Sequence, residues 1–210
     1  MILVFDLDNT LINRNKAYWL WLENNVLPKL NTIDKDLILY YDNWGYTSRR
    51  HFYNWLIIKY ELAFTSDFLI KKCANELHNF ISKNQNILEI LATLKKSYRI
   101  VIGSNGGTTN QMNKLKKADL LQYADRVFIS EAVGYKKPNP EFYKHIQEEM
   151  NCSPNEFIFI GDHYKQDYLA PKKLGWKSIW LSHHRTSIID DCIFSLNDLI
   201  PYLRENKNCL

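Results

Sequence analysis

The acidic side chains that could do chemistry follow two short apolar runs of this sequence. Asp6 and Asp8 lie in the segment FDLDNT, and Asp162 follows a second apolar run, with Asp167 five residues later. Carboxylates alone would repel a phosphate group, so a cation is needed to reverse the local field. Mg²⁺ suits such a site because it binds through one or two carboxylates, waters and substrate phosphate oxygens. The acids therefore predict a magnesium site.

Two other segments carry groups that bind phosphate oxygens. Ser104 and Asn105 end an apolar run and lead through a glycine-rich turn into a helical pattern, where hydroxyl and backbone N–H groups are available. Lys137 adds a positive charge, and the Gly-x-x-Lys-Pro spacing favours it over Lys136, which we expect to face solvent. With the acids, these residues provide the nucleophile, positioning and charge neutralisation that phosphoryl transfer requires.

Short apolar runs and helical patterns alternate along the chain and would position these residues. The apolar runs cover residues 2–5, 99–103, 127–129, 157–161 and 177–181. The helical patterns cover residues 87–96, 107–118, 140–150 and 167–174. This alternation predicts an α/β fold, with a parallel sheet covered by helices on both faces. Because ligands of such sheets bind at the carboxyl ends of the strands, we expect the polar residues after each run to meet there.

Residues 15–86 interrupt the alternation. They are rich in aromatic residues and show helical spacing without a convincing strand pattern. We therefore expect a core domain of residues 1–14 and 87–210, with residues 15–86 forming an inserted helical domain.

The order of the motifs resembles that of the haloacid dehalogenase-like (HAD) hydrolase superfamily. The motifs are Asp6-Leu7-Asp8-Asn9-Thr10, Ser104, Lys137, and Gly161-Asp162 followed by Asp167. Each motif alone is weak evidence, but together they span nearly the whole chain in the expected order. The resemblance implies a Rossmann-like core and an all-helical cap of the first type, formed by residues 15–86.

The resemblance also implies roles for the acids. Asp6 would attack phosphorus and form an aspartyl-phosphate. Asp8 would protonate the leaving oxygen and then deprotonate the attacking water. The carboxylates of Asp6 and Asp162 and the backbone carbonyl of Asp8 would bind Mg²⁺.

The remaining motif residues would hold the phosphate and the lysine. Ser104 and the amide of Asn105 would bind the phosphate, and Lys137 would neutralise charge on the nucleophile and the phosphoryl group. Asp167 would orient the lysine or metal-bound waters, and Thr10 would help to position the loop. Ser104, Asp167 and Thr10 could instead be ordinary caps of a turn or a helix, and for Asp167 and Thr10 that alternative stays open. The alternative for Lys137 is an exposed surface lysine.

Asp8 favours one branch of the superfamily. A dehalogenase has no leaving oxygen to protonate and usually lacks this second acid, so the resemblance implies a phosphatase. Its substrate would be a small phosphorylated metabolite, either a nucleotide or a sugar phosphate. Two alternatives stay open: a phosphosugar mutase of the β-phosphoglucomutase type, which shares the four motifs, and a non-catalytic binding or regulatory module.

Four residues of the inserted segment are candidates for substrate contact: Trp44, Tyr46, Arg49 and Arg50. Aromatic rings stack on planar groups, and arginine pairs with anions. The alternative is that the aromatic residues belong to the core of this domain and that the arginines are solvated.

The histidines and cysteines do not indicate a zinc site or a disulfide framework. We expect His163 to be structural or solvated, and His183-His184 to be loop residues, because no acid or cysteine stands at zinc-like spacing. The four cysteines show no CxxC pairing, which favours reduced thiols in a cytoplasmic protein.

Composition indicates an ordinary globular chain. Of 210 residues, 46% are hydrophobic and 24% are charged, with a formal net charge of +4. The lysines form short, scattered clusters, which favours solvated helix faces over a nucleic-acid surface. No signal peptide or stretch of membrane-spanning length is recognisable. We expect a cytoplasmic monomer or weak homodimer without a nucleic-acid or membrane partner.

Overall fold

The computed structural model describes residues 1–29, 34–183 and 189–206. The chain divides into two compact units, which are residues 1–12 with 83–210, and residues 13–82. The first unit contains the sheet. In the second unit, the residues that the structure describes form helices and turns.

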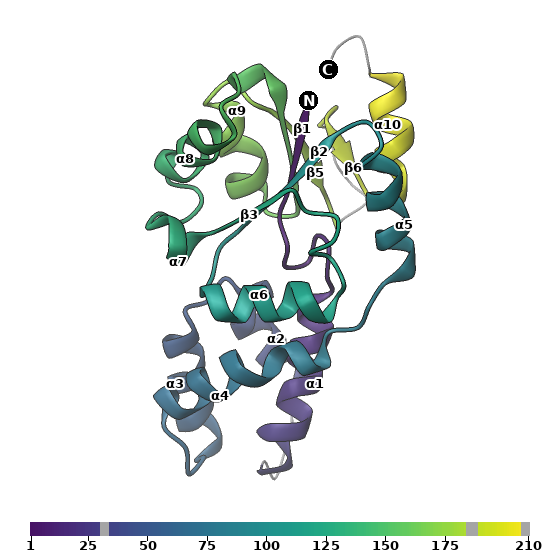
Figure 1. Cartoon of the computed structure of the whole chain (residues 1–210). Helices are drawn as coiled ribbons and strands as arrows, with labels where there is room; N and C mark the ends of the chain where they lie inside the picture. The colour runs from purple at the N-terminus through teal and green to yellow at the C-terminus, as the bar shows by residue number, and fades with distance from the viewer. Residues whose placement is uncertain (30–33, 184–188, 207–210) are drawn as a thin grey trace. The chain divides into compact units, whose positions relative to one another are not determined.

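The sheet of the first unit has six parallel strands in the order β3-β2-β1-β4-β5-β6 (Figure 1). The strands are β1 (Ile2–Phe5), β2 (Arg99–Ser104), β3 (Arg126–Ile129), β4 (Phe157–Gly161), β5 (Lys177–Leu181) and β6 (Cys192–Ile193). All five apolar runs form strands, which confirms the predicted parallel α/β sheet. The short strand β6 was not predicted, because two residues carry no periodic signal.

The register of the central strand brings the polar strand ends together. In β1, Phe5 pairs with Ile102 of β2 on one side and with Ile160 of β4 on the other. The backbone N–H of Asp6 donates to the Ile160 carbonyl at 2.9 Å, which extends this ladder by one bond. The residues that follow the three strands therefore leave the sheet at one edge.

Helices cover both faces of the sheet, with α8 and α9 on one face and α5 and α10 on the other (Figure 1). The helices of this unit are α5 (Gln85–Leu94), α6 (Thr108–Lys117), α7 (Ser130–Val133), α8 (Pro140–Met150), the π-helix η5 (Tyr164–Leu169), α9 (Ala170–Lys172) and α10 (Leu199–Glu205), with the short 3₁₀ turns η4 (Pro154–Glu156) and η6 (Leu196–Asp198). Aromatic residues fill the space under α8, where the rings of Phe157 and Trp176 stack with centroids 4.2 Å apart.

One predicted helix differs in form. The pattern at 167–174 predicted one regular helix, but the chain forms the π-helix η5 and then the short helix α9. Pro171 has no N–H to donate to the carbonyl of Asp167, so the regular bonding of an α-helix is interrupted there.

The second unit contains α1 (Arg14–Asn25), α2 (Lys35–Asp42), α3 (Arg49–Tyr60) and α4 (Ser66–Glu76), joined by the short turns η1 (Leu27–Lys29), η2 (Asn43–Gly45) and η3 (Leu77–Phe80). Its core is aromatic, with Tyr18, Trp21, Phe52 and Tyr53 fully buried. Ring pairs such as Trp21 and Tyr53 meet edge to face at 6.3 Å, the geometry that aromatic quadrupoles favour. This packing explains the concentration of aromatic residues in the inserted segment.

None of the described helices has the length and apolarity that a membrane-spanning segment needs. Among the described residues, Cys73, Cys152 and Cys192 form no disulfide with one another, and Cys209 lies outside the described residues.

Candidate active site

The turn after β1 folds tightly around one carbonyl. The carbonyl oxygen of Leu7 accepts hydrogen bonds from the N–H groups of Thr10 and Leu11 at 3.3 and 3.0 Å. The turn requires a positive φ of 60° at Asn9, a conformation that asparagine tolerates better than most residues. As a result, the hydroxyl of Thr10 returns to within 3.5 Å of Oδ2 of Asp6.

Thr10 also connects this turn to the end of β4. Its Oγ1 accepts a bond from the N–H of Asp162 at 3.1 Å and lies 3.4 Å from Oδ1 of the same residue. The indole N–H of Trp180 donates to the carbonyl of Asp162 at 2.8 Å. Both sides of Asp162 are therefore fixed, and its carboxylate faces that of Asp6.

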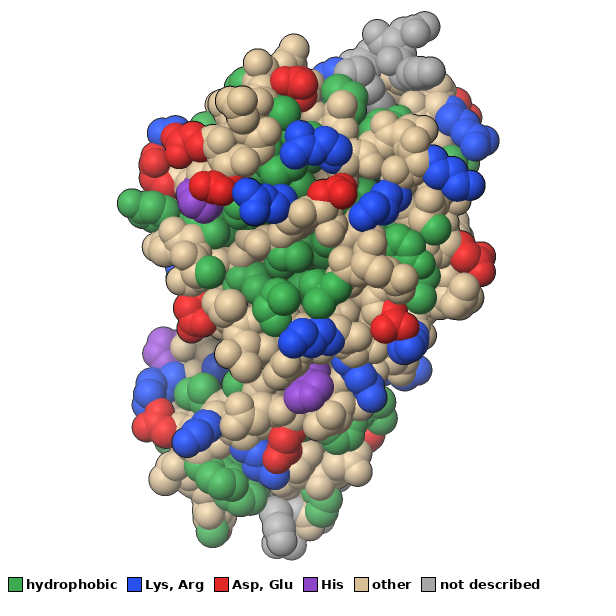
Figure 2. Space-filling view, viewed as in Figure 1, with side chains coloured by type: hydrophobic (Ala, Val, Ile, Leu, Met, Phe, Trp, Pro, Cys, Tyr) green, Lys and Arg blue, Asp and Glu red, His purple; other side chains and the backbone are tan. Residues whose placement is uncertain are grey.

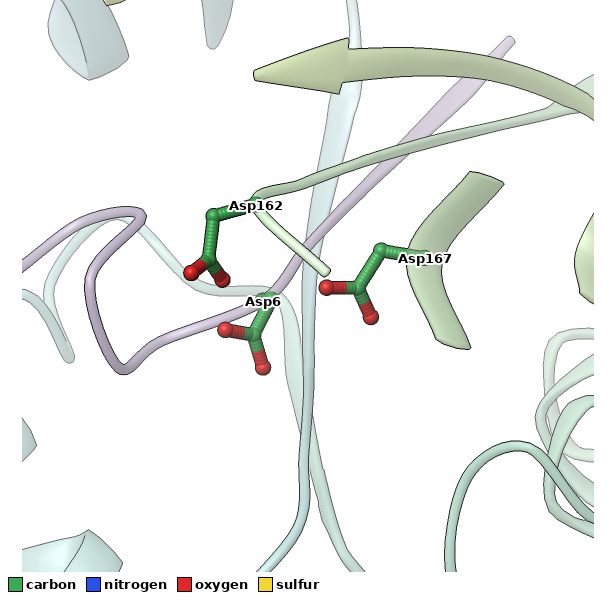
Figure 3. A group of neighbouring side chains, drawn as sticks. All are labelled: Asp6, Asp162 and Asp167. Carbon is green, nitrogen blue, oxygen red and sulfur yellow. The ribbon is translucent and has the colours of Figure 1, made fainter. Parts of the chain in front are cut away.

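Three carboxylates converge at the carboxyl ends of β1 and β4 (Figure 3). One oxygen from each of Asp6, Asp162 and Asp167 lies within 4.8 Å of the others. The ammonium of Lys137, which is 2% exposed, donates to Asp6 and Asp167 at 2.7 Å each. With all three carboxyl groups ionised, the carboxylates and the one ammonium have a net charge of −2, which a divalent cation would balance. The oxygen donor set therefore fits Mg²⁺.

Gly161 permits the close approach of Asp167. A Cβ atom at position 161 would lie 2.5 Å from the carboxyl carbon of Asp167, far inside van der Waals contact. Asp167 uses both oxygens, accepting from the N–H of His163 at 3.0 Å through Oδ2 and from Lys137 through Oδ1. The predicted contact between Asp167 and the lysine is thus present.

Burial and neighbouring charges both shift the pKa values of this cluster. It raises the pKa of Asp6 to about 7, although the nearby Lys137 ammonium acts in the opposite direction. Burial alone would lower the pKa of Lys137, but the carboxylates of Asp167 and Asp6 outweigh it and raise that pKa above its usual range. The lysine is therefore charged, and Asp6 becomes fully ionised only at a pH above its pKa of about 7 or when a cation is bound.

The predicted phosphate-binding residues lie at the end of β2. Ser104 is 1% exposed, and its Oγ accepts a bond at 2.7 Å from the side-chain amide of Gln111. The side chain of Asn105 holds the backbone of Lys137, accepting from its N–H at 2.8 Å and donating to its carbonyl at 2.9 Å. Asn105 therefore positions the lysine, a contact that the sequence did not indicate.

Two residues of α6 at the site were not predicted: Gln111 and Lys114. The Lys114 ammonium donates to both carboxylate oxygens of Asp8 at 2.8 Å, and Gln111 donates to Oδ2 at 3.1 Å. The Asp8 carboxylate thus lies against α6 and not in the carboxylate cluster. Their spacing of three places both residues on one face of the helix, but nothing in the sequence distinguishes that face from a solvated one.

His183 lies nearer to the site than its prediction as a loop residue indicated. The Nε2 atom of His183 is 3.0 Å from the carbonyl oxygen of Asn9 and 3.9 Å from Oδ2 of Asp162. Burial lowers the pKa of the His163 imidazole. The backbone N–H of His163 donates to Oδ2 of Asp167. His184 lies outside the described residues.

The four candidate contact residues of the second unit differ in environment. Trp44 and Tyr46 are each 44% exposed and are not part of its core. Arg49 pairs with the buried Asp42 at 2.7 Å, whereas Arg50 forms an exposed pair with Asp67.

Comparison with known proteins identifies the class. The family model described as haloacid dehalogenase-like hydrolase matches residues 3–181. The chain therefore belongs to this hydrolase family, which confirms the predicted family and the prediction that the protein is an enzyme.

Its relatives include phosphatases. It is 24% identical to a glyceraldehyde 3-phosphate phosphatase of Pyrococcus furiosus, over 90% of this chain and 83% of the relative. It is also 24% identical to the pyrimidine 5′-nucleotidase PynA of Streptococcus pneumoniae, over 91% of this chain and 77% of the relative. The magnesium-bound structure of YfnB, a putative HAD-hydrolase from Bacillus subtilis, has a TM-score of 0.77 at 18% identity and covers 96% of this chain and 97% of that chain. This structural likeness confirms the Rossmann-like fold.

Proposed function

We propose that this protein is a Mg²⁺-dependent phosphatase that hydrolyses a small phosphomonoester through an aspartyl-phosphate on Asp6. The observation that carries this proposal is the convergence of the Asp6, Asp162 and Asp167 carboxylates, of which Asp6 and Asp167 accept from the ammonium of Lys137. A cluster of this charge would repel a phosphate without a cation and would attract it with one. The names of the two curated relatives, a phosphatase and a nucleotidase, support the same reaction class.

In the first half of the reaction, a carboxylate oxygen of Asp6 forms a bond to phosphorus. The bond from phosphorus to the leaving oxygen breaks, and its electron pair goes to that oxygen. Asp8, carrying a proton, transfers it to the leaving oxygen, so the product departs as a neutral alcohol. Ser104 and the Asn105 amide bind the phosphoryl oxygens, and Lys137 offsets their charge.

In the second half, Asp8 takes a proton from a water molecule while the water oxygen bonds to phosphorus. The Asp6–phosphorus bond breaks, its electron pair returns to the Asp6 carboxylate, and inorganic phosphate leaves. The enzyme then has its original atoms and charges.

The carboxylates of Asp6 and Asp162 and the backbone carbonyl of Asp8 would bind Mg²⁺. When bound, the ion supplies positive charge that draws the phosphate towards the carboxylates. Asp167, with both oxygens engaged, orients Lys137, and Thr10 keeps Asp6 beside Asp162. The magnesium in the related YfnB structure supports this cofactor.

We infer a small phosphorylated metabolite as substrate, either a nucleotide or a sugar or triose phosphate. The unit of residues 13–82 is the candidate cap that would set this specificity, with Trp44 and Tyr46 as exposed candidates for contact. Basic and acidic side chains are interspersed on the face shown in Figure 2, which supports a small anion over a nucleic acid as partner. We also propose a cytoplasmic location and a monomer or weak homodimer.

The test is phosphate release from p-nitrophenyl phosphate and from a panel of nucleotides and sugar phosphates with Mg²⁺. Wild type should release phosphate, and Asp6→Asn should not. Failure of wild type on the whole panel would contradict the proposal. Transfer of phosphate between positions of a sugar, without release to water, would indicate the mutase instead.

A further inference from the structure

We propose that Lys114, assisted by Gln111, is a positioning residue that fixes the carboxyl group of Asp8 for proton transfer to the leaving oxygen. This inference rests on the proposed phosphatase function and deepens it. It concerns two residues of α6 that lie outside the four sequence motifs and contact Asp8 of the first motif.

The burial of Lys114 is the first observation. Lysine is almost never fully buried unless it is paired, yet the side chain of Lys114 is only 3% exposed. Its ammonium lies 2.8 Å from both oxygens of Asp8, whose side chain is 29% exposed. The buried lysine thus holds both oxygens of the ionised Asp8 carboxylate, which still reaches solvent. When Asp8 carries a proton, one oxygen keeps the contact with Lys114 and the other bears the proton for the leaving group.

Gln111 provides a second restraint on the same carboxylate. Its side-chain N–H₂ group lies 3.1 Å from Oδ2 of Asp8, 2.7 Å from Oγ of Ser104 and 3.1 Å from the carbonyl oxygen of Asn105. Because an amide nitrogen has two hydrogens, it serves two of these acceptors at a time. Gln111 therefore connects the proposed acid to the strand end proposed to bind phosphate.

The helix that carries both residues is itself anchored. The N–H of Thr108, in its first turn, donates to the carboxylate of Glu131 at 2.8 Å. Just before the helix, the N–H of Gly106 donates to the hydroxyl of Ser130 at 2.9 Å. Leu115, next to Lys114, is fully buried. These contacts hold the helix that carries Lys114 in place.

The position of the Asp8 carboxyl group affects the rate, because a general acid must lie within hydrogen-bond distance of the oxygen that it protonates. Misplacing a reacting group by about 1 Å can cost about 100-fold in rate. The loss should depend on the leaving group, because an alkoxide needs a proton as it departs and a nitrophenolate needs little help. Loss of the Lys114 contact should therefore slow alkyl phosphates selectively.

The experiment compares glycerol phosphate with p-nitrophenyl phosphate in wild type and Lys114→Met, both with Mg²⁺. The measured quantity is kcat/KM, which reports steps up to departure of the first leaving group and excludes hydrolysis of the aspartyl-phosphate. We expect the value for glycerol phosphate to fall about 100-fold and that for p-nitrophenyl phosphate to fall less than about 5-fold.

Asp8→Asn should show the same split between the two substrates. For glycerol phosphate, kcat/KM of the double variant Asp8→Asn, Lys114→Met should be little lower than that of Asp8→Asn alone. The effects of substituting residues that act as a unit are not additive. The matched control is Lys116→Met on the same helix. Because this side chain is exposed, we expect kcat/KM for the two substrates to change by the same small factor. Circular dichroism and a thermal melt check that each variant is folded.

If Lys114→Met does not fold, Gln111→Leu replaces it. That change removes an uncharged hydrogen-bond donor to Asp8. We expect kcat/KM for glycerol phosphate to fall about 10-fold more than kcat/KM for p-nitrophenyl phosphate. Equal losses on both substrates in a folded variant would overturn the inference and leave a structural role for the pair. Failure of wild type on both substrates would instead overturn the proposed function, and the inference with it.

Discussion

The ammonium of Lys137 lies 2.7 Å from Oδ1 of Asp6, although 131 positions separate the two residues in the chain. Asp6 directly follows the central strand β1, and Lys137 comes from the loop after α7. The parallel sheet brings them together because all of its strands end at one edge. Lys137 is held on its other side by Asp167, so the geometry of the proposed nucleophile depends on three separate segments.

Asp6 should destabilise the metal-free protein at alkaline pH. Its pKa rises from 3.8 in the unfolded reference to about 7 in the folded protein. A raised pKa means that its contribution to stability is complete below about pH 4 and is lost as the pH rises through 7. In EDTA, Asp6→Asn should therefore raise the free energy of unfolding at pH 8 by about 1–3 kcal/mol, and by much less at pH 4.

Urea unfolding at the two pH values measures this difference. The exposed Glu148→Gln is the matched control, because it removes an acid outside the site. A wild type that is as stable as Asp6→Asn at pH 8, without metal, would contradict the electrostatic description of the cluster.

Gly161→Ala should damage the site through Asp167. The added methyl group would lie 2.5 Å from the Asp167 carboxylate, which must then move away from Lys137. We expect a stability loss of about 1–3 kcal/mol, as for other overpacked sites, and about a 100-fold loss of kcat/KM. The control for stability is Gly107→Ala, where the nearest atom to a new Cβ is 3.7 Å away. A Gly161→Ala enzyme with normal kcat/KM would contradict the importance of this contact.

Lys137→Met should lower kcat by about 1,000-fold, because it removes the positive charge proposed to offset the phosphoryl oxygens. Lys136→Met is a closely matched control, since its side chain is exposed and the one next to it is buried. We expect kcat of Lys136→Met to stay within about 2-fold of wild type, as for surface changes in general. Comparable losses in the two variants would argue against the assignment of Lys137.

Asp162 should control the response to Mg²⁺. A ligand that binds only the folded protein at 100 times its dissociation constant stabilises by about 2.7 kcal/mol. Mg²⁺ should therefore raise the melting temperature of wild type, and EDTA should reverse the shift. In Asp162→Asn the shift should be much smaller, whereas His183→Ala should retain most of it. An unchanged shift in Asp162→Asn would place the ion elsewhere.

Much of the fold could be predicted because buried parallel strands have a simple signature. Runs such as 157–161 are apolar throughout, since both faces of the sheet are covered. The polar residues after them then meet at one edge, and this placed Asp6 near Asp162 without further information.

Other features depend on tertiary geometry and could not be predicted. In the sequence, Lys114 does not differ from other lysines of a helix. Only the structure shows that its side chain is buried against Asp8. The amide of Asn105 was predicted to bind phosphate, but no pattern indicated that its side chain holds the Lys137 backbone through two hydrogen bonds. Such contacts depend on loop conformations that apolar periodicity does not determine.

The most direct test of the central proposal is to trap the covalent intermediate. Wild type mixed with substrate and Mg²⁺ is quenched in acid within one turnover, and its peptides are analysed by mass spectrometry. The proposal predicts one phosphoryl group on the peptide that contains Asp6, none in Asp6→Asn, and accumulation in a variant such as Asp8→Asn that hydrolyses the intermediate slowly. Turnover by Asp6→Asn at the wild-type rate, or a phosphoryl group on another residue, would contradict it.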